Sequence, residues 1–302
     1  MRVITNINDF KLDRGSCVAI GVFDGMHKAH RLIISSALKM ARGMRVAAVV
    51  LTFWPHPQGK PSLNSLSRRL RMIEELGVDV CVVIRFDRKF AGVSRDDFVK
   101  NILVGRLNAR AVFIGNNFRF GKNQKGDVRF LEKASREYGF IVKAFKVLKI
   151  GNADISSTLI RGLISAGKLK QAEKILTRPV SILGTVIEGE SLAAKLGFPT
   201  ANIEAHHEIL PPPGIYSVRI ILDKKEYPGV CYIGSSPTFF GKNKKQSIEA
   251  HIFNFKKNIY GRDLEIQFIR KIRDESRFSS PQNLVKQVKK DIIKAKSFFL
   301  NH

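Results

Sequence analysis

The first half of the chain consists of short apolar runs separated by longer stretches in which apolar residues recur every three or four positions. The runs predict β-strands and the longer stretches predict amphipathic helices. The predicted strands cover residues 17–23, 46–53, 78–86 and 111–115. Strands that alternate with helices are typical of a parallel, doubly wound sheet. We therefore expect an α/β fold for this part of the chain.

Three helices are predicted between these strands. The first covers residues 30–42, and its inner side is expected to carry Leu32, Ile33, Ala37, Leu38 and Ala41. The second covers residues 66–76 and ends at Gly77. Ser94 and Asp97 form a capping box that predicts the start of the third.

The pattern changes after Arg178-Pro179. Short strand-like runs broken by Gly and Pro then predict a small antiparallel β-barrel. The runs are residues 181–186, 214–222, 229–234, 250–255 and 264–272. A final helix begins at Pro281, and its apolar stripe consists of Leu284, Val288, Ile292 and Ala295. We predict two domains, residues 1–178 and 179–302, as a chain of 302 residues favours.

The composition is globular, with 44% hydrophobic and 26% charged residues, but the formal net charge is +26 and the pI is about 10.2. A charge of this size attracts polyanions such as nucleic acids, anionic membranes and nucleotide phosphates. Lys and Arg occur along the whole chain, so a solvated basic surface is the simpler interpretation.

The cysteines and the apolar segments indicate a reduced protein outside the membrane. Cys17, Cys81 and Cys231 are odd in number and form no CxxC pair, which argues against a disulfide framework and a zinc site. The longest apolar stretch, residues 46–54, is too short to cross a bilayer, and the N-terminus has no signal-peptide pattern. We expect a cytoplasmic protein.

Histidine and glycine residues follow the first predicted strand. In an open parallel sheet, ligands bind beyond the carboxyl ends of the strands. Gly21 and Gly25 permit close backbone approach, and a helix that opens near His27 offers free N–H groups to an anion. His27 and His30 are one turn apart, so both rings can face a polyphosphate and donate hydrogen bonds to it. This segment predicts a phosphate site.

A second candidate phosphate element is the polar turn that contains Ser156, Ser157 and Thr158, followed one turn later by Arg161. Each element also has a structural interpretation. The two histidines can be a coincidence on a helix surface, Pro55-His56-Pro57 can be a rigid turn, and the hydroxyls can be a helix cap. Their convergence on one sheet edge favours the functional interpretation.

Four motifs, residues 21–30, 55–57, 115–121 and 155–161, resemble in order those of the FAD synthetase module in bacterial bifunctional riboflavin kinase/FAD synthetases. The resemblance implies a nucleotidyltransferase-type sheet and direct attack of the FMN phosphate on the α-phosphorus of ATP, with release of pyrophosphate.

The resemblance also assigns roles to residues of the first domain. His27 and His30 would be catalytic and would stabilise the transferring group. The ATP phosphates would be held by Gly21, Asp24, Gly25, Ser156, Ser157, Thr158 and Arg161. The flavin would be bound by Pro55, His56, Pro57, Asn117 and Arg119.

The second domain contains a candidate magnesium site. Thr200 and Asn202 lie on the same side of an extended segment, and their oxygens suit a Mg²⁺ ion that bridges ATP phosphates. Taken alone, a surface turn explains them. The motifs of this domain resemble those of riboflavin kinases in their order, at residues 196–202, 214–216, 229–230, 233–234, 237–239, 249–251 and 260–261. The resemblance makes Glu249 the base for the 5′-hydroxyl of riboflavin.

Some positions depart from the family pattern. Ala29 replaces a glycine where the nucleotide base approaches the backbone, so we expect weaker ATP binding. Ala193 and Ala194 replace a Gly-Arg pair, although Lys195 follows them. Thr177 replaces a glycine at the predicted hinge.

Three functional hypotheses remain. The first is a two-activity enzyme that uses ATP, Mg²⁺ and flavins, acting as a monomer or weak homo-oligomer without nucleic-acid or membrane partners. The second is an FAD synthetase with a degenerate kinase domain. The third is a nucleic-acid-binding protein. The net charge favours this hypothesis, as do the basic segments interleaved with aromatic residues at 239–245 and 255–260.

Overall fold

The computed structural model describes residues 1–189, 197–206, 209–235 and 246–300. The chain divides into two compact units, Met1–Ser62 with Leu66–Leu159, and Leu63–Ser65 with Ile160–His302.

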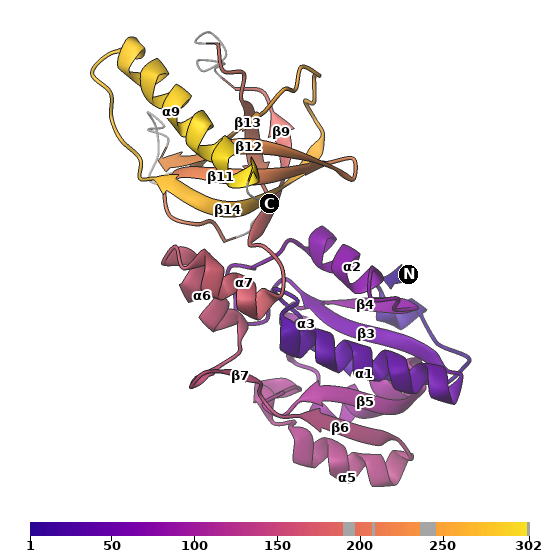
Figure 1. Cartoon of the computed structure of the whole chain (residues 1–302). Coiled ribbons are helices and arrows are strands. Elements are labelled where there is room, and N and C mark those ends of the chain that lie inside the picture. Colours follow the sequence, from indigo (N-terminus) through magenta and orange to yellow (C-terminus); the bar gives the residue numbers. More distant parts are fainter. Residues whose placement is uncertain (190–196, 207–208, 236–245, 301–302) are drawn as a thin grey trace. The chain divides into compact units, whose positions relative to one another are not determined.

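The first unit is built on a parallel sheet with the strand order β1-β4-β3-β2-β5-β6 (Figure 1). The strands are β1 (Arg2–Ile4), β2 (Ser16–Ile20), β3 (Ala47–Trp54), β4 (Val80–Arg85), β5 (Ala109–Gly115) and β6 (Ile141–Phe145). The chain proceeds from β2 to one side through β3 and β4 and then returns to the other side at β5. The loops after β2 and β5 therefore flank the point at which the strand order reverses, where open α/β sheets bind ligands.

Helices cover both faces of this sheet, because alternate residues of each buried strand point to opposite sides. On one face, Cys17 and Ala19 pack with residues of α1 (Lys28–Met44) and α2 (Leu66–Glu74). On the other, Val18 and Ile20 pack with the π-helical segment η2 (Phe98–Arg106) and with α5 (Val128–Tyr138). The predicted doubly wound sheet is confirmed.

The remaining elements of the first unit are short. They are η1 (Ile7–Asp9), α3 (Arg88–Ala91), α4 (Arg95–Asp97), η3 (Lys122–Gln124), β7 (Lys149–Ile150) and β8 (Ala153–Asp154). The predicted cap is confirmed, since the Asp97 N–H donates to the Ser94 hydroxyl at 2.9 Å.

The predicted inner face of α1 is wrong at one position. Leu32 is 42% exposed, whereas Ile34, which the prediction omitted, is 1% exposed. At 100° per residue, the stripe through Ile33, Ala37 and Ala41 extends toward Ile34 and leaves Leu32 on the opposite side. The bounds of the predicted elements also shift by a few residues, as at 66–76, where α2 ends at Glu74.

The second unit contains a closed barrel with the strand order β10-β13-β12-β11-β14-β9. Its strands are β9 (Ser181–Ile187), β10 (Ala201–Ala205), β11 (Gly214–Leu222), β12 (Lys225–Ser235), β13 (Gln246–Ile252) and β14 (Asp263–Arg273), and neighbouring strands are antiparallel. The predicted barrel is confirmed. β10 was not predicted, because only Ile203 of its five residues is buried and no apolar run marks it.

Two helices, α6 (Ser157–Ser165) and α7 (Leu169–Leu176), precede the barrel, and α9 (Pro281–Leu300) follows it. Thr177 ends α7 in the left-handed conformation, with φ 58° and ψ 25°, and its N–H donates to the Glu173 carbonyl at 2.8 Å. Glycine adopts this conformation without strain, which explains the glycine of the resembled family at this position.

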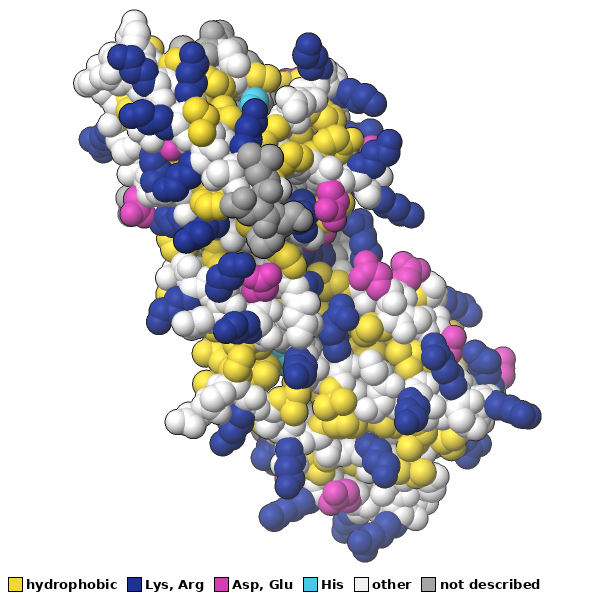
Figure 2. Space-filling model, in the orientation of Figure 1, with side chains coloured by type: hydrophobic (Ala, Val, Ile, Leu, Met, Phe, Trp, Pro, Cys, Tyr) yellow, Lys and Arg dark blue, Asp and Glu magenta, His cyan; other side chains and the backbone are white. Residues whose placement is uncertain are grey.

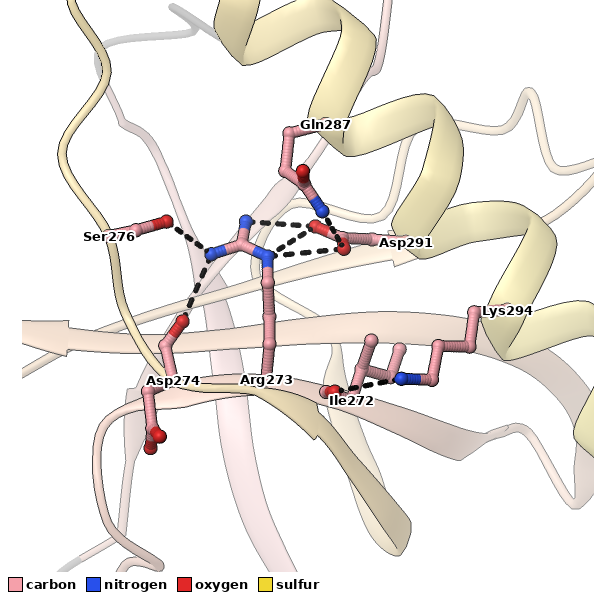
Figure 3. Close-up of polar contacts among 7 residues, drawn as sticks. All are labelled: Ile272, Arg273, Asp274, Ser276, Gln287, Asp291 and Lys294. Atoms are coloured by element: carbon pink, nitrogen blue, oxygen red, sulfur yellow. Dashed lines mark hydrogen bonds and ion pairs between the residues drawn. The ribbon is translucent and has the colours of Figure 1, made fainter.

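An ion pair between the partly buried Arg273 and the buried Asp291 connects α9 to the end of β14 (Figure 3). The Arg273 Nη2 donates to Asp291 Oδ2 at 2.8 Å and the Arg273 Nε donates to Asp291 Oδ1 at 3.1 Å. The remaining nitrogen, Nη1, donates to the carbonyl of Asp274 and to the hydroxyl of Ser276. The Gln287 amide donates to Asp291 Oδ1 at 2.9 Å, so the buried carboxylate is well satisfied.

We predict that Asp291→Asn lowers the free energy of unfolding of the second unit by about 2 kcal/mol, because the Arg273 guanidinium loses its charged acceptor. Urea unfolding measures this change. Asp274→Asn is the matched control, because the Asp274 side chain is 88% exposed and pairs only with Lys271 among the residues described. Equal stability of the Asp291→Asn variant and the wild type would show that the charge of Asp291 does not stabilise the packing of α9.

Candidate functional site

The loop between β2 and α1 turns sharply. Phe23, Gly25 and Met26 have φ angles of 52°, 81° and 42°, in the left-handed region that favours glycine. This turn sends the side chains of Phe23 and Met26 into the core, where both are almost fully buried. Two non-glycine residues in this region mark a strained loop of the kind found at functional sites.

The two histidines of this loop lie against each other. His27 is the cap residue of α1, and its backbone is still extended, with φ −72° and ψ 172°. The rings of His27 and His30 are stacked, with centroids 3.5 Å apart and planes inclined by 22°. The edge-to-face ring of Phe23, 5.3 Å from that of His30, supports the pair. Both imidazoles thus lie beside the first turn of α1, where its free N–H groups attract anions.

The environment of His30 disfavours its charged form. Burial lowers the pKa of His30 well below its ordinary value, and the nearby charges of His27 and Arg69 lower it further. Its Nδ1 atom is buried and has no hydrogen-bond partner among the residues that the structure describes. An anion placed against the pair would offset the positive neighbours and favour protonation of the ring.

The second phosphate element meets this loop at Asp24. The Ser157 hydroxyl donates to the Asp24 carbonyl at 2.9 Å, so the start of α6 lies beside the β2 loop. The Ser156 hydroxyl accepts from the Leu159 N–H at 3.2 Å and therefore caps α6. Thr158 is exposed. Arg161 belongs to the second unit, and its role in phosphate binding stays a prediction.

The predicted flavin-binding residues follow β3 and β5, on either side of β2. After β3, a cis peptide bond precedes Pro55, and the His56 Nδ1 accepts from the Gln58 N–H at 3.1 Å. After β5, Asn117 and Arg119 are exposed, and Arg119 donates to the Phe118 carbonyl at 3.2 Å. Their location at one sheet edge suits a ligand there, and their contact with flavin stays a prediction.

A residue that the sequence analysis missed lies beneath this loop. Arg69 of α2 is 0% exposed, and its Nη2 lies 3.6 Å from Asp24 Oδ1. A signal was present, because Arg68 and Arg69 occupy the same helical stripe as Met72 and Ile73, which are buried. Cations on an apolar stripe indicate a buried charge that needs a partner.

The candidate site of the second unit lies where β10 pairs with β13. Asn202 is directly opposite Glu249 in the register, and the Thr200 hydroxyl donates to Glu249 Oε2 at 3.1 Å. The structure therefore brings together the three predicted residues of this site. A hydroxyl, an amide and a carboxylate form an oxygen-rich set of the kind that Mg²⁺ prefers.

Gly189 packs against this site. A Cβ atom built on Gly189 would lie 1.9 Å from the Nδ2 of Asn202, so a larger residue here would displace this side chain from its present position.

Some predicted features lie outside the described residues. These are Ala193, Ala194, Lys195 and Leu196, the motif Pro237-Thr238-Phe239, and the basic segment 239–245. The described part of the chain contains no group of three or more His, Cys, Asp or Glu side chains that could hold a metal ion.

The three cysteines are free and buried, as predicted. Burial raises the pKa of the Cys17 thiol to about 11 and that of Cys81 to about 12, although Arg69 opposes the shift at Cys81. None of the described helices is long and apolar enough to cross a membrane. Lys and Arg side chains are scattered over the visible face (Figure 2), which agrees with a solvated basic surface.

Two family models match the chain in succession. The model described as FAD synthetase matches residues 9–159, and the model described as riboflavin kinase matches residues 176–299.

Similar proteins match over nearly the whole chain. The bifunctional riboflavin kinase/FMN adenylyltransferase of Buchnera aphidicola subsp. Schizaphis graminum is 34% identical, over 99% of this chain and 99% of that protein. The enzyme of the same name from Escherichia coli K12 is 34% identical, over 99% and 98%. A crystal structure of a Streptococcus pneumoniae chain that bears the name macrolide-efflux protein matches with a TM-score of 0.85 at 28% identity, over 97% of this chain and 98% of that one.

We predict that Gly189→Ala lowers the turnover of the reaction at the β10–β13 site about tenfold, because the new methyl group displaces Asn202. The reaction at the β2 loop should be unchanged, since that loop belongs to the other unit. Separate assays of the two reactions measure the effect. Gly162→Ala is the control, since a Cβ there meets no atom within 4 Å. An unaffected Gly189→Ala variant would mean that the position of Asn202 is immaterial.

Proposed function

Because the chain belongs to the family of bifunctional riboflavin kinase/FMN adenylyltransferases, we propose that the β2 loop of the first unit is its adenylyl-transfer site and that the β10–β13 pair of the second unit is its kinase site. The protein is a transferase that uses ATP to convert riboflavin to FMN and FMN to FAD. The predicted domain boundary at residue 178 is part of this proposal.

In the first reaction site, a phosphate oxygen of FMN attacks the α-phosphorus of ATP, the bond from that phosphorus to the bridging oxygen breaks, and pyrophosphate leaves. The stacked histidines are the observation that carries this assignment. Their N–H groups donate to phosphate oxygens that gain negative charge during transfer. The loop at Gly21, Asp24 and Gly25 and the start of α6 at Ser156, Ser157 and Thr158 hold the triphosphate.

The environment of His30 would respond to a bound nucleotide. Burial and the neighbouring positive groups lower the pKa of His30, whereas the negative charge of a polyphosphate acts in the opposite direction. A protonated ring opposite a phosphate oxygen donates a charge-assisted hydrogen bond.

In the kinase site, Glu249 accepts the proton of the riboflavin 5′-hydroxyl while that oxygen attacks the γ-phosphorus of ATP, and ADP leaves. The Thr200 hydroxyl, 3.1 Å from Glu249, orients the carboxylate. The oxygens of Thr200 and Asn202 fit Mg²⁺, which commonly takes few protein ligands and completes its shell with phosphate oxygens and water. When bound, the ion neutralises charge on the ATP phosphates.

We also propose a cytoplasmic enzyme that acts as a monomer or a weak homo-oligomer and binds no specific nucleic acid. Its three cysteines are free, as in a reducing compartment. Light scattering of the purified protein tests the oligomeric state.

We predict that His30→Ala lowers FAD formation from FMN by 100-fold or more, as loss of one transition-state donor does, and leaves riboflavin phosphorylation intact. Glu249→Ala should lower FMN formation by roughly 100-fold to 10,000-fold, as loss of a general base does, and leave FAD formation from FMN intact. Product analysis with riboflavin or FMN as substrate, together with ATP and Mg²⁺, measures both.

The wild-type protein is the reference for this pair of variants. Failure of the wild type to form FAD and pyrophosphate from FMN would refute the adenylyl-transfer site. FAD formation without riboflavin phosphorylation would instead indicate a degenerate kinase unit. Loss of both reactions in either variant would mean that the two sites are not independent.

A further inference from the structure

Arg69 is buried in the first unit without a full set of hydrogen bonds. Its Nη1 donates to the Phe53 carbonyl at 3.1 Å and to the Thr52 hydroxyl at 3.4 Å. Its Nε and Nη2 have no hydrogen-bond acceptor among the residues that the structure describes. A buried guanidinium that is only partly satisfied costs folding free energy. Such an arrangement indicates a functional requirement at this position.

The contacts of Arg69 converge on the loop that carries the histidines. The guanidinium lies over the Trp54 ring, 5.4 Å from its centroid, and is anchored at the carboxyl end of β3. Its Nη2 lies 3.6 Å from the carboxylate of Asp24, which is 1% exposed. The Thr52 hydroxyl in turn donates to the Val22 carbonyl at 2.9 Å. The end of β3 is thus joined to the loop after β2 directly, by the bond from Thr52 to Val22, and through Arg69, which contacts both Phe53 and Asp24.

Asp24 connects Arg69 to the residues that are predicted to bind phosphate. Its carboxylate faces Arg69, and its carbonyl accepts the hydrogen bond of Ser157. Three residues further along the chain lies His27, which is stacked on His30. A shift of the Asp24 backbone would therefore displace both the histidine pair and Ser157.

We propose that Arg69 is a positioning residue for adenylyl transfer, which holds Asp24 so that the histidine pair and Ser157 face the same triphosphate. This inference rests on the proposed assignment of adenylyl transfer to the β2 loop. Arg69 acts through Asp24, and the planar guanidinium serves because it reaches the Phe53 carbonyl, the Thr52 hydroxyl and the carboxylate together, which a lysine cannot do.

The charge of Arg69 also acts on His30. The ionisable groups around His30 are His27 on α1 and Arg69 on α2, with Asp24 as the partner of Arg69. After burial and His27, Arg69 is the third cause that lowers the pKa of His30. Removal of the Arg69 charge therefore raises the pKa of His30 toward its ordinary value.

The test compares Arg69→Met, Arg69→Lys, Asp24→Asn and the double variant Arg69→Met/Asp24→Asn in the full-length protein. For FAD formation from FMN, Arg69→Met should lower kcat about 100-fold while KM for ATP changes less than threefold, as a misplaced catalytic group does. Arg69→Lys should fall between Arg69→Met and the wild type. The double variant should be no slower than the slower single variant, because both changes break the same contact between Arg69 and Asp24.

Two controls separate positioning from folding. Arg71→Met changes an exposed arginine of the same helix and should retain wild-type kcat. Riboflavin phosphorylation by the second unit reports on the integrity of the preparation. If Arg69→Met is unstable, the kcat and KM of Arg69→Lys carry the test. If Arg69→Met is folded, the NMR titration of its His30 ring in the unliganded protein gives a readout other than activity, and its midpoint should rise relative to the wild type.

Wild-type kcat in Arg69→Met, additive losses in the double variant, or an unchanged His30 titration would each overturn the inference. These outcomes leave the proposed function intact as long as the wild type forms FAD from FMN. Absence of FAD formation in the wild type would instead overturn the proposed function itself.

Discussion

The loop after β2 in the first unit is built around the buried carboxylate of Asp24. The loop after β2 must pass from a fully buried strand to the start of α1, and it does so by turning Phe23 and Met26 into the core. That turn carries the Asp24 carboxylate into the interior, where an unpaired anion is costly. The cation on α2 meets this requirement, since the Arg69 guanidinium faces the carboxylate. The Asp24 carbonyl accepts the hydrogen bond of Ser157, and the stacked histidines follow Asp24 closely in the chain.

The two units place their polar groups by different means. In the first, a helix start and a strained loop present N–H groups and imidazoles, which suit an anion directly. In the second, antiparallel register sets Asn202 opposite Glu249, and the oxygens there suit a cation that in turn holds phosphates. In the parallel sheet, the polar groups lie in a loop beyond a strand end. In the closed barrel, they lie on neighbouring hydrogen-bonded strands.

Two arginines that pair with buried carboxylates, Arg69 and the partly exposed Arg273, contrast with the basic surface. Arg69 and Arg273 each face a buried carboxylate, of Asp24 and of Asp291 respectively, and each connects a helix to a strand end. Other Lys and Arg side chains are scattered over the visible face (Figure 2). The net charge of +26 is therefore a poor guide to these two ion pairs, because each is defined by a buried carboxylate partner.

The amino-acid sequence by itself determined the elements and the chemistry of the motifs. Apolar periodicity is a local property, so it predicted the central strands of the parallel sheet, the barrel and the helix at Pro281. It missed the edge strands β1 and β6, the helices α5 and α7 and the short strand β10, and it placed Leu32 on the wrong side of α1. The residues His27, His30 and Glu249 stood out because their motifs are local as well.

Only the tertiary structure decided which distant residues meet. The ion pair of Arg69 with Asp24, the bond from Ser157 to the Asp24 carbonyl and the register of Asn202 against Glu249 join segments far apart in the chain. Such contacts depend on how helices pack on a sheet and on how strands align, and both are set by the burial of the whole core and not by neighbours in sequence.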